Sequence, residues 1–445
     1  MASTYLSYTQ GTPTNNKKWT WSAWVKFTRT GEQYFMASYV DANNNTSIRF
    51  LDATGRLDFQ NYVSGGDAGR LKTSRNLRDP SAWYHIVCVF DSDNVTSGDR
   101  QQIWINGVRE TAFDTETYPS SGAASIINAN TRVAELGRRS DNANMFDGEM
   151  SHVQFVDGLA LAPTEFGETD ATDGMWKLKT ATYGTAGTNG FHLKMENSSN
   201  MDLDSSSNGH TFSTTGTLTA TNDNPDNNFC TLNPLDNFRA RASFSNGNTT
   251  LTTATGDATF NTSTSWLTTG KWYCEVQVVT TIGDEMFGIV GSPTINNTNC
   301  VGCTTNGFAI QSSTGDFRKD NASGTSYGSA WHTNGKIVGM FFDLDNNKIY
   351  WSVDGVLQNS GTGMDIPAST SSLIPYKAYS VAFNDGGAAS GVYNFNFGNG
   401  YFGTTAITSP VEVGEGKWKY TPTGTFDSAS KTFRAICTDN IQEYG

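Results

Sequence analysis

The sequence predicts an all-β protein built from two tandem β-sandwiches, and three observations support this fold class. An apolar strand, a polar loop, a second strand with a tryptophan, and an Asn-Gly or Asp-Gly turn occur in this order twice, over residues 83–108 and 339–356. Aromatic residues make up 12% of the chain and 45 residues are glycine, which suits pleated strands and tight turns. Residues 19–27 place apolar side chains at every second position, as a half-buried strand does.

The first sandwich is expected over residues 1–165, where apolar segments alternate with polar turns. The expected strands lie near residues 5–8, 19–27, 34–39, 47–51, 57–60, 83–90, 102–105, 133–137 and 146–158. Each is short, rich in aromatic or β-branched residues, and bounded by turn-forming residues. Residues 163–166 begin with proline and form the one helical turn of note that we expect.

Residues 166–235 are polar and rich in Gly, Ser and Asn, with one strand-like segment at 190–195. We interpret them as a connection that packs on the first domain. The second sandwich is expected over residues 236–402. Its expected strands are residues 241–244, 271–279, 286–290, 307–311, 336–344, 348–353 and 391–397. Residues 403–445 form an irregular C-terminal tail, which we interpret as a candidate docking segment.

Charge and hydropathy exclude several kinds of partner. The formal net charge is −13, and no cluster of Lys and Arg is present that could neutralise phosphates, so we expect no nucleic-acid partner. No apolar run approaches the roughly 20 residues that a membrane-spanning helix needs. The N-terminus lacks the basic start and apolar stretch of a signal peptide. We therefore expect synthesis in a cytoplasm without classical export.

The six cysteines give little chemical signal. Cys300 and Cys303 form the one close pair, and without a second pair or a nearby histidine this spacing is a weak zinc signal. We expect ordinary loop or core thiols.

Catalysis is not expected. A retaining glycosidase needs two carboxylates about 5 Å apart in one cleft, and no strand carries such a pair. Glu149 and Glu275 each stand alone in their strands, so we expect both on solvent faces. The chain has five histidines that could serve as a base, but it contains no Gly-x-Ser-x-Gly nucleophile motif. We therefore predict a protein that is not an enzyme.

Two kinds of binding site have candidates. Asp202, Asp204 and Asn208 alternate through a loop that ends in glycine, a pattern of oxygen ligands that suits Ca²⁺, although Asp and Asn are also the common turn residues. No other cofactor is expected. Tyr62, Tyr327 and Trp331 lie in polar, Gly-rich stretches and are candidates for stacking on sugars. The alternative for Trp331 is a structural role, capping the core.

Two family resemblances support the sandwich prediction. The first domain resembles the laminin G-like, concanavalin A-like jelly-roll family. The segments that carry this resemblance are residues 21–26, 83–85, 103–107 and 146–151. The second domain resembles the SPRY family, which is also a concanavalin A-like sandwich. Its matching segments are residues 270–276, 288–290, 342–345 and 349–355. The resemblances imply two tandem concanavalin A-like jelly rolls.

The combination resembles virion structural proteins of tailed phages that infect marine bacteria. The segments that carry this resemblance are residues 146–151, 155–161, 190–193, 230–235 and 431–438. It implies a non-enzymatic fibre, spike or decoration protein on the virion surface, made in the host cytoplasm. The expected partners are other virion proteins, further copies of the chain, with a trimer favoured, and a host-surface polysaccharide. The alternatives are a secreted or surface lectin of a cell and a jelly-roll enzyme that degrades polysaccharide.

Overall fold

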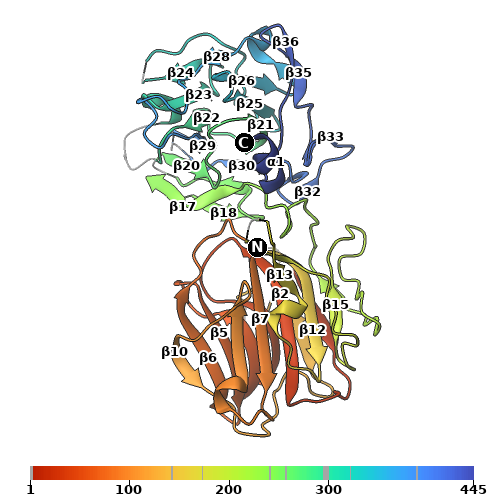
Figure 1. Cartoon of the computed structure of the whole chain (residues 1–445). Helices are drawn as coiled ribbons and strands as arrows, with labels where there is room; N and C mark the ends of the chain where they lie inside the picture. Colours follow the sequence, from red (N-terminus) through yellow and green to blue (C-terminus); the bar gives the residue numbers. More distant parts are fainter. Residues whose placement is uncertain are drawn as a thin grey trace. The chain divides into compact units, whose positions relative to one another are not determined.

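The computed structural model describes residues 4–141, 144–172, 174–239, 242–255, 258–293, 300–320, 322–386 and 389–445. The chain divides into two compact units, unit 1 (Met1–Ala220) and unit 2 (Thr221–Gly445). Each contains two large antiparallel sheets, which confirms the predicted all-β fold class (Figure 1). Residue 241, where we expect a strand to begin, lies outside the described residues. Within those residues, no helix has the length and apolar character required to cross a membrane.

Unit 1 is a sandwich of an eight-stranded and a six-stranded sheet (Figure 1). The eight-stranded sheet has the order β10-β6-β5-β4-β3-β11-β1-β16. Its strands are β1 (Tyr5–Thr9), β3 (Gln33–Asp41), β4 (Asn44–Phe50), β5 (Arg56–Val63), β6 (Gly66–Asn76), β10 (Phe113–Thr117), β11 (Val133–Leu136) and β16 (Ser213–Thr215). The six-stranded sheet has the order β15-β12-β2-β7-β8-β9. Its strands are β2 (Lys18–Phe27), β7 (Tyr84–Asp91), β8 (Gln101–Ile105), β9 (Val108–Arg109), β12 (Gly148–Asp157) and β15 (Phe191–Leu193).

The predicted alternation in β2 explains only one of its two faces. Trp19, Trp21 and Phe27 point into the core between the sheets, as expected. The opposite face of the six-stranded sheet is also covered, because Phe166 packs with apolar residues of β7 and β12. This covering segment contains the 3-10 turn η2 (Pro163–Glu165) and the paired strands β13 (Gly167–Thr169) and β14 (Trp176–Leu178). A further 3-10 turn among the described residues of unit 1 is η1 (Ser97–Asp99).

Unit 2 repeats the two-sheet plan. Its six-stranded sheet has the order β17-β20-β29-β22-β23-β24. These strands are β17 (Leu232–Arg239), β20 (Thr259–Ser263), β22 (Met286–Val290), β23 (Gly307–Gln311), β24 (Phe317–Lys319) and β29 (Ser380–Asn384). The other sheet has the order β18-β19-β30-β21-β25-β26-β27, and β28 also pairs with β26. These strands are β18 (Ser243–Ser245), β19 (Thr250–Thr252), β21 (Lys271–Thr280), β25 (Ile337–Asp343), β26 (Lys348–Val353), β27 (Val356–Leu357), β28 (Met364–Asp365) and β30 (Val392–Asn396).

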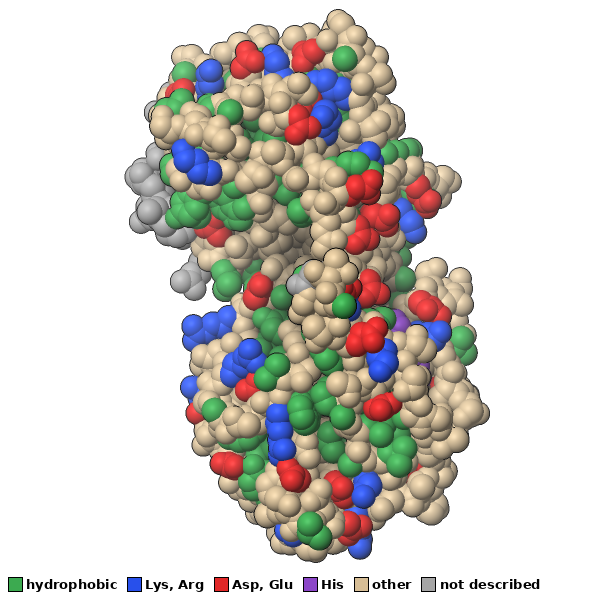
Figure 2. Space-filling view, in the orientation of Figure 1, with side chains coloured by type: hydrophobic (Ala, Val, Ile, Leu, Met, Phe, Trp, Pro, Cys, Tyr) green, Lys and Arg blue, Asp and Glu red, His purple; other side chains and the backbone are tan. Residues whose placement is uncertain are grey.

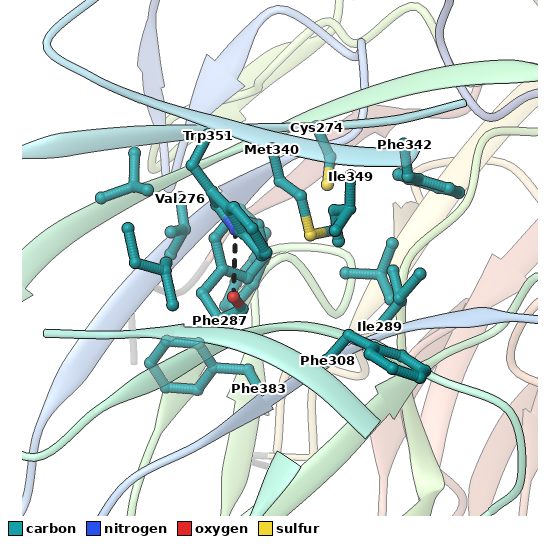
Figure 3. Close-up of a cluster of buried hydrophobic side chains, with 14 of the residues drawn as sticks. Cys274, Val276, Phe287, Ile289, Phe308, Met340, Phe342, Ile349, Trp351 and Phe383 are labelled. Carbon is teal, nitrogen blue, oxygen red and sulfur yellow. Dashed lines mark hydrogen bonds between the residues drawn. The ribbon is translucent and has the colours of Figure 1, made fainter. Parts of the chain in front are cut away.

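The core of unit 2 is fixed by a tryptophan that bridges the two sheets. Trp351 lies on β26, and its indole Nε1 donates a hydrogen bond of 3.1 Å to the carbonyl oxygen of Phe287 on β22 (Figure 3). Met340 and Phe383 belong to the same buried cluster. A buried indole N–H is stabilised by such a partner, and this bond fixes the orientation of the ring.

The two repeated hairpins end in the same kind of turn. Asn106 and Gly107 connect β8 to β9 with φ angles of 48° and 76°, and Asp354 and Gly355 connect β26 to β27 with 48° and 79°. Two successive residues in the left-handed region define the tight hairpin turn whose twist matches its strands, and Asn-Gly and Asp-Gly adopt it most readily. The sequence signal is therefore explained by backbone conformation.

The C-terminal tail is part of unit 2. It contains β31 (Tyr401–Phe402), β32 (Thr405–Ala406), β33 (Val411–Val413), β34 (Gly416–Trp418), β35 (Thr423–Phe426), β36 (Ala429–Thr432) and the helix α1 (Thr438–Tyr444). Trp418, Phe426 and Phe433 are buried against Tyr273 and Phe341, on the outer side of the larger sheet. The sequence pattern did not indicate α1 or the hairpins of this tail.

The expectation of free thiols at the Cys-x-x-Cys pair is wrong. Cys300 and Cys303 form a disulfide with a Cα–Cα distance of 4.8 Å. Cys300 immediately precedes the 3-10 turn η3 (Val301–Cys303) and Cys303 is its last residue, so the turn brings the two backbones within the range that a disulfide spans. Another 3-10 segment in the described part of unit 2 is η4 (Gln358–Gly361). Cys88, Cys230, Cys274 and Cys437 are free and buried.

Candidate functional site

A polar face with two partly exposed tyrosines lies on the outer side of the eight-stranded sheet in unit 1. Tyr39 on β3 pairs with Asn45 on β4, and Asn45 pairs with Tyr62 on β5. Directly opposite residues in an antiparallel sheet share a face. We call Tyr39, Asn45 and Tyr62 the tyrosine row. The two tyrosine rings are partly exposed, and Asn45 is buried between them. The backbones of Tyr39 and Tyr62 are separated by two strand spacings, which together amount to roughly 10 Å.

A buried ion cluster lies beside the tyrosine row on the same face. The Nε atoms of Arg49 and Arg70 lie 3.0 and 2.8 Å from the two carboxylate oxygens of Asp58. Arg49 also donates to the Tyr34 hydroxyl at 2.9 Å and to Gln60 Oε1 at 3.0 Å. Asp58 is fully buried, so both of its oxygens depend on these partners. The cluster connects β4, β5 and β6 and fixes their register.

Arg139, in the segment after β11, extends this face. Its guanidinium carbon lies 5.0 Å from the ring centre of Tyr34 and 5.4 Å from that of Tyr39. Its Nε donates to Asp141 at 2.6 Å, and one terminal nitrogen lies 3.4 Å from Asn45 Oδ1. A cation over two aromatic faces is held by the ring quadrupoles. Arg139 therefore stiffens the Tyr39 end of the row.

The predicted stacking residues do not come together. Tyr62 lies on the outer face of unit 1, where its hydroxyl donates to the carbonyl oxygen of Gly65 at 2.8 Å. Tyr327 and Trp331 lie in the hydrophobic core of unit 2. Tyr327 stands edge-on to Trp351, with ring centres 5.4 Å apart, and accepts a bond from its backbone N–H. The burial of Trp331 fits the structural alternative given for it, and Tyr327 is buried in the same core.

The candidate calcium residues organise a loop of unit 1. The carboxylate of Asp204 accepts bonds from the backbone N–H groups of His192, Ser206 and His210 at 2.8–2.9 Å, and from the Ser206 hydroxyl at 3.0 Å. Asp202 accepts a bond from Thr214, and the amide of Asn208 donates to two glycine carbonyls. Among the described residues, no three His, Cys, Asp or Glu side chains are grouped to hold a metal ion. Calcium binding here stays a prediction.

A serine–histidine contact that the sequence did not indicate lies on the covered face of unit 1. His85 Nε2 is 2.8 Å from Ser22 Oγ, and its Nδ1 is 2.9 Å from the indole Nε1 of Trp176. Because an indole nitrogen only donates, Nδ1 is the acceptor and the neutral ring carries its proton on Nε2. Burial lowers the pKa of His85 to about 3. The ring thus donates to Ser22 and does not act as the base that would activate this hydroxyl.

The expectation that Glu275 faces solvent is wrong. Its side chain is fully buried, because the C-terminal tail covers this part of β21. One carboxylate oxygen accepts from the Tyr420 N–H and the Tyr273 hydroxyl, and the other from the Lys419 N–H and the Asn396 amide, at 2.8–3.1 Å. Burial raises the pKa of Glu275 to about 6 despite these donors. Glu275 therefore anchors the tail. Glu149 is half-buried on β12.

The visible surface carries no large patch of one charge. Lys and Arg side chains are interspersed with Asp and Glu over the side shown in Figure 2.

The comparisons with known proteins agree with the sandwich fold. Residues 1–165 match the family described as the concanavalin A-like lectin/glucanases superfamily. No curated protein matches the chain. Neither the family match nor the similar structures indicate a phage origin.

Similar solved structures include two SPRY domains and a pentraxin. The SPRY domain of human HERC1 is 12% identical, with 37% of this chain and 96% of that chain covered and a TM-score of 0.30. A second human SPRY domain is 14% identical, with coverages of 36% and 95% and a TM-score of 0.28. The heptameric SAP-like pentraxin from Limulus polyphemus is 16% identical, with coverages of 36% and 72% and a TM-score of 0.28. Likenesses at this level say nothing of what the chain binds.

Proposed function

We propose that the chain is a carbohydrate-binding protein and that the tyrosine row of unit 1 is its sugar-binding surface. The observation that carries this proposal is the arrangement of Tyr39, Asn45 and Tyr62 as direct neighbours on three adjacent strands. The match of residues 1–165 to a superfamily of lectins and glucanases supports the same class of ligand.

The chemistry of the row suits a saccharide. Aromatic faces pack against the C–H groups of a sugar ring, and the surrounding amide and charged groups can hydrogen-bond its hydroxyls. The backbones of Tyr39 and Tyr62 lie roughly 10 Å apart, about the length of a disaccharide, so each ring can contact a different sugar. Asp67, which pairs with Tyr62 on the neighbouring strand, adds an acceptor at one end.

Rigidity favours binding by this face. Strand residues have little backbone freedom left to lose, and the ion cluster of Arg49, Asp58 and Arg70 immobilises the side chains beside the row. A surface that is ordered before the ligand arrives avoids part of the entropic cost of association.

The test is a glycan array on the full chain, followed by calorimetric titration with the strongest ligand. We expect Tyr62→Ala to weaken binding about tenfold, since losing one stacking ring costs on the order of 1.4 kcal/mol. Tyr376→Ala is the matched control, because Tyr376 is 62% exposed and belongs to unit 2. Equal affinities for the wild type and Tyr62→Ala would refute the assignment of the site.

We further propose that this binding is not catalytic. The direction of the bond from His85 to Ser22 and the saturated carboxylate of Glu275 support this view. Incubation of the purified chain with its best polysaccharide ligand should release no reducing sugar. Sustained release above that of a boiled sample would overturn the proposal in favour of the glycanase alternative.

We propose, more specifically, that the chain is a phage virion surface protein, namely a fibre, spike or decoration protein that adheres to host glycans. Its support is the sequence resemblance carried by residues 146–151, 155–161 and 431–438. Mass spectrometry of purified particles should find the chain, and sedimentation should give a homo-oligomer, with a trimer favoured. Absence from particles, together with strong glycan binding by a monomer, would instead favour a cellular lectin.

The C-terminal tail is retained as a proposed docking segment, but its test must preserve the fold. Truncation after Phe402 would remove Trp418, Phe426 and Phe433 from a buried cluster, so loss of particle assembly would not distinguish docking from unfolding. Glu412→Lys, at an exposed position of β33, leaves the cluster intact. Unchanged incorporation of this variant into particles would argue against docking through this hairpin.

A further inference from the structure

A β-bulge in β12 changes the direction of the strand at a histidine. The pairing of β12 with β2 runs in register from Gly148 to Ser151, shifts, and resumes at Gln154. His152 lies in this shift with a φ of 49°, in the left-handed region that few non-glycine residues adopt. Bulges of this kind re-aim a side chain, and here the re-aimed side chain is an imidazole.

A second histidine lies on the neighbouring edge strand. His192 of β15 pairs with Gln154, the residue at which the register of β12 with β2 resumes. The His152 and His192 ring centres are 5.6 Å apart, and the ring planes are tilted by 50°. His192 Nε2 is buried and has no hydrogen-bond partner among the described residues. Buried nitrogen atoms of this kind are rare without a partner, so this atom calls for an explanation.

We propose that His152 and His192 form a binding site for a divalent transition-metal ion of the Zn²⁺, Ni²⁺ or Cu²⁺ type, with water completing the coordination. Two imidazoles that bind one ion at about 2 Å have ring centres roughly 5–6 Å apart, which the observed separation matches. Neutral imidazole is the preferred ligand of these ions, whereas Ca²⁺ and Mg²⁺ prefer oxygen.

The surroundings support coordination by both rings. Ser151 Oγ lies 2.9 Å from His152 Nδ1, the type of contact that orients a metal-binding imidazole through its other nitrogen. Lys194, two residues beyond His192, has its ammonium nitrogen 3.4 Å from Glu196 Oε1, which offsets the positive charge next to the proposed site.

This site is independent of the proposed sugar-binding function. The tyrosine row lies on the eight-stranded sheet of unit 1, whereas the histidines lie on β12 and β15 of its six-stranded sheet. A failure of either proposal leaves the other unaffected.

The experiment is calorimetric titration of the full chain, without a polyhistidine tag and stripped with chelator, with ZnCl₂, NiCl₂ and CuCl₂ at pH 7.5. We expect one site per chain for at least one of the ions. His152→Gln and His192→Gln should each raise its dissociation constant at least about tenfold, as loss of one of two protein ligands implies. His332→Gln is the control, because His332 lies in unit 2 and bonds a backbone carbonyl.

A second readout guards against variants that fail to fold. The bound ion should raise the unfolding temperature of the wild type and of His332→Gln, but not that of His152→Gln or His192→Gln. A cooperative unfolding transition of these two variants without metal establishes that they are folded. Binding that survives both His152→Gln and His192→Gln, or the absence of any stoichiometric binding by the wild type, would overturn the proposal.

Discussion

Substitution of Glu275 by glutamine tests how the C-terminal tail is held to unit 2. Glu275 is fully buried, and its pKa rises from an ordinary 4.5 to about 6. Because the folded pKa lies above the unfolded one, the folded state binds the proton more tightly. The stability from this effect is complete below pH 4.5 and is lost as the pH rises through 6. The whole difference corresponds to roughly 2 kcal/mol.

Glu275→Gln cannot titrate, so the pH dependence should disappear from this position. We expect the free energy of unfolding of the wild type, minus that of Glu275→Gln, to fall by roughly 1 kcal/mol between pH 5 and pH 7.5. Urea unfolding followed by tryptophan fluorescence measures this difference, since Trp418 of the tail packs against Tyr273 with ring centres 4.8 Å apart.

Glu412→Gln is the control for a general effect of charge, because Glu412 is exposed on β33. Its difference from the wild type should not vary with pH. A Glu275→Gln difference that is constant with pH, or that grows as the pH rises, would refute the reasoning about this buried carboxyl group.

Three further substitutions test the packing. Trp418→Ala should lower the free energy of unfolding by about 3–5 kcal/mol in urea, because the ring is fully buried, and a loss below 1 kcal/mol would contradict that packing. Asp58→Ala should cost about 3–5 kcal/mol, because it leaves Arg49 and Arg70 without their shared partner, and an unchanged thermal midpoint would argue against the cluster. Gly107→Ala should lower the thermal midpoint by several degrees, since its φ is 76° and the new Cβ would lie 2.6 Å from the Trp176 ring. A neutral result there would mean that the turn is not as described.

Local patterns predicted the sandwich architecture well. The Asn-Gly and Asp-Gly turns identified both hairpins, because Asn, Asp and Gly adopt the left-handed backbone of such turns more readily than other residues. The core-facing side of β2 followed from its alternation. By contrast, β6 and β10 have polar sequences and form strands because they pair with neighbouring strands. Such pairing cannot be predicted from local composition.

Sites were harder to predict, because burial depends on segments distant in sequence. Tyr62 and Tyr327 both lie in polar, Gly-rich sequence, yet one lies on an outer sheet face and the other inside a core. Glu275 occupies a strand that looks half-exposed until residues 419–420, about 145 residues later, return to cover it. The tyrosine row likewise joins three strands whose register the sequence alone does not specify.

The most direct test of the proposed function is hydrogen exchange of the full chain with and without its strongest saccharide ligand. We predict that the ligand slows exchange within β3, β4 and β5 around Tyr39, Asn45 and Tyr62, and leaves unit 2 unchanged. Slowed exchange confined to unit 2, or to the segment around Asp204, would contradict the assignment of sugar binding to the tyrosine row.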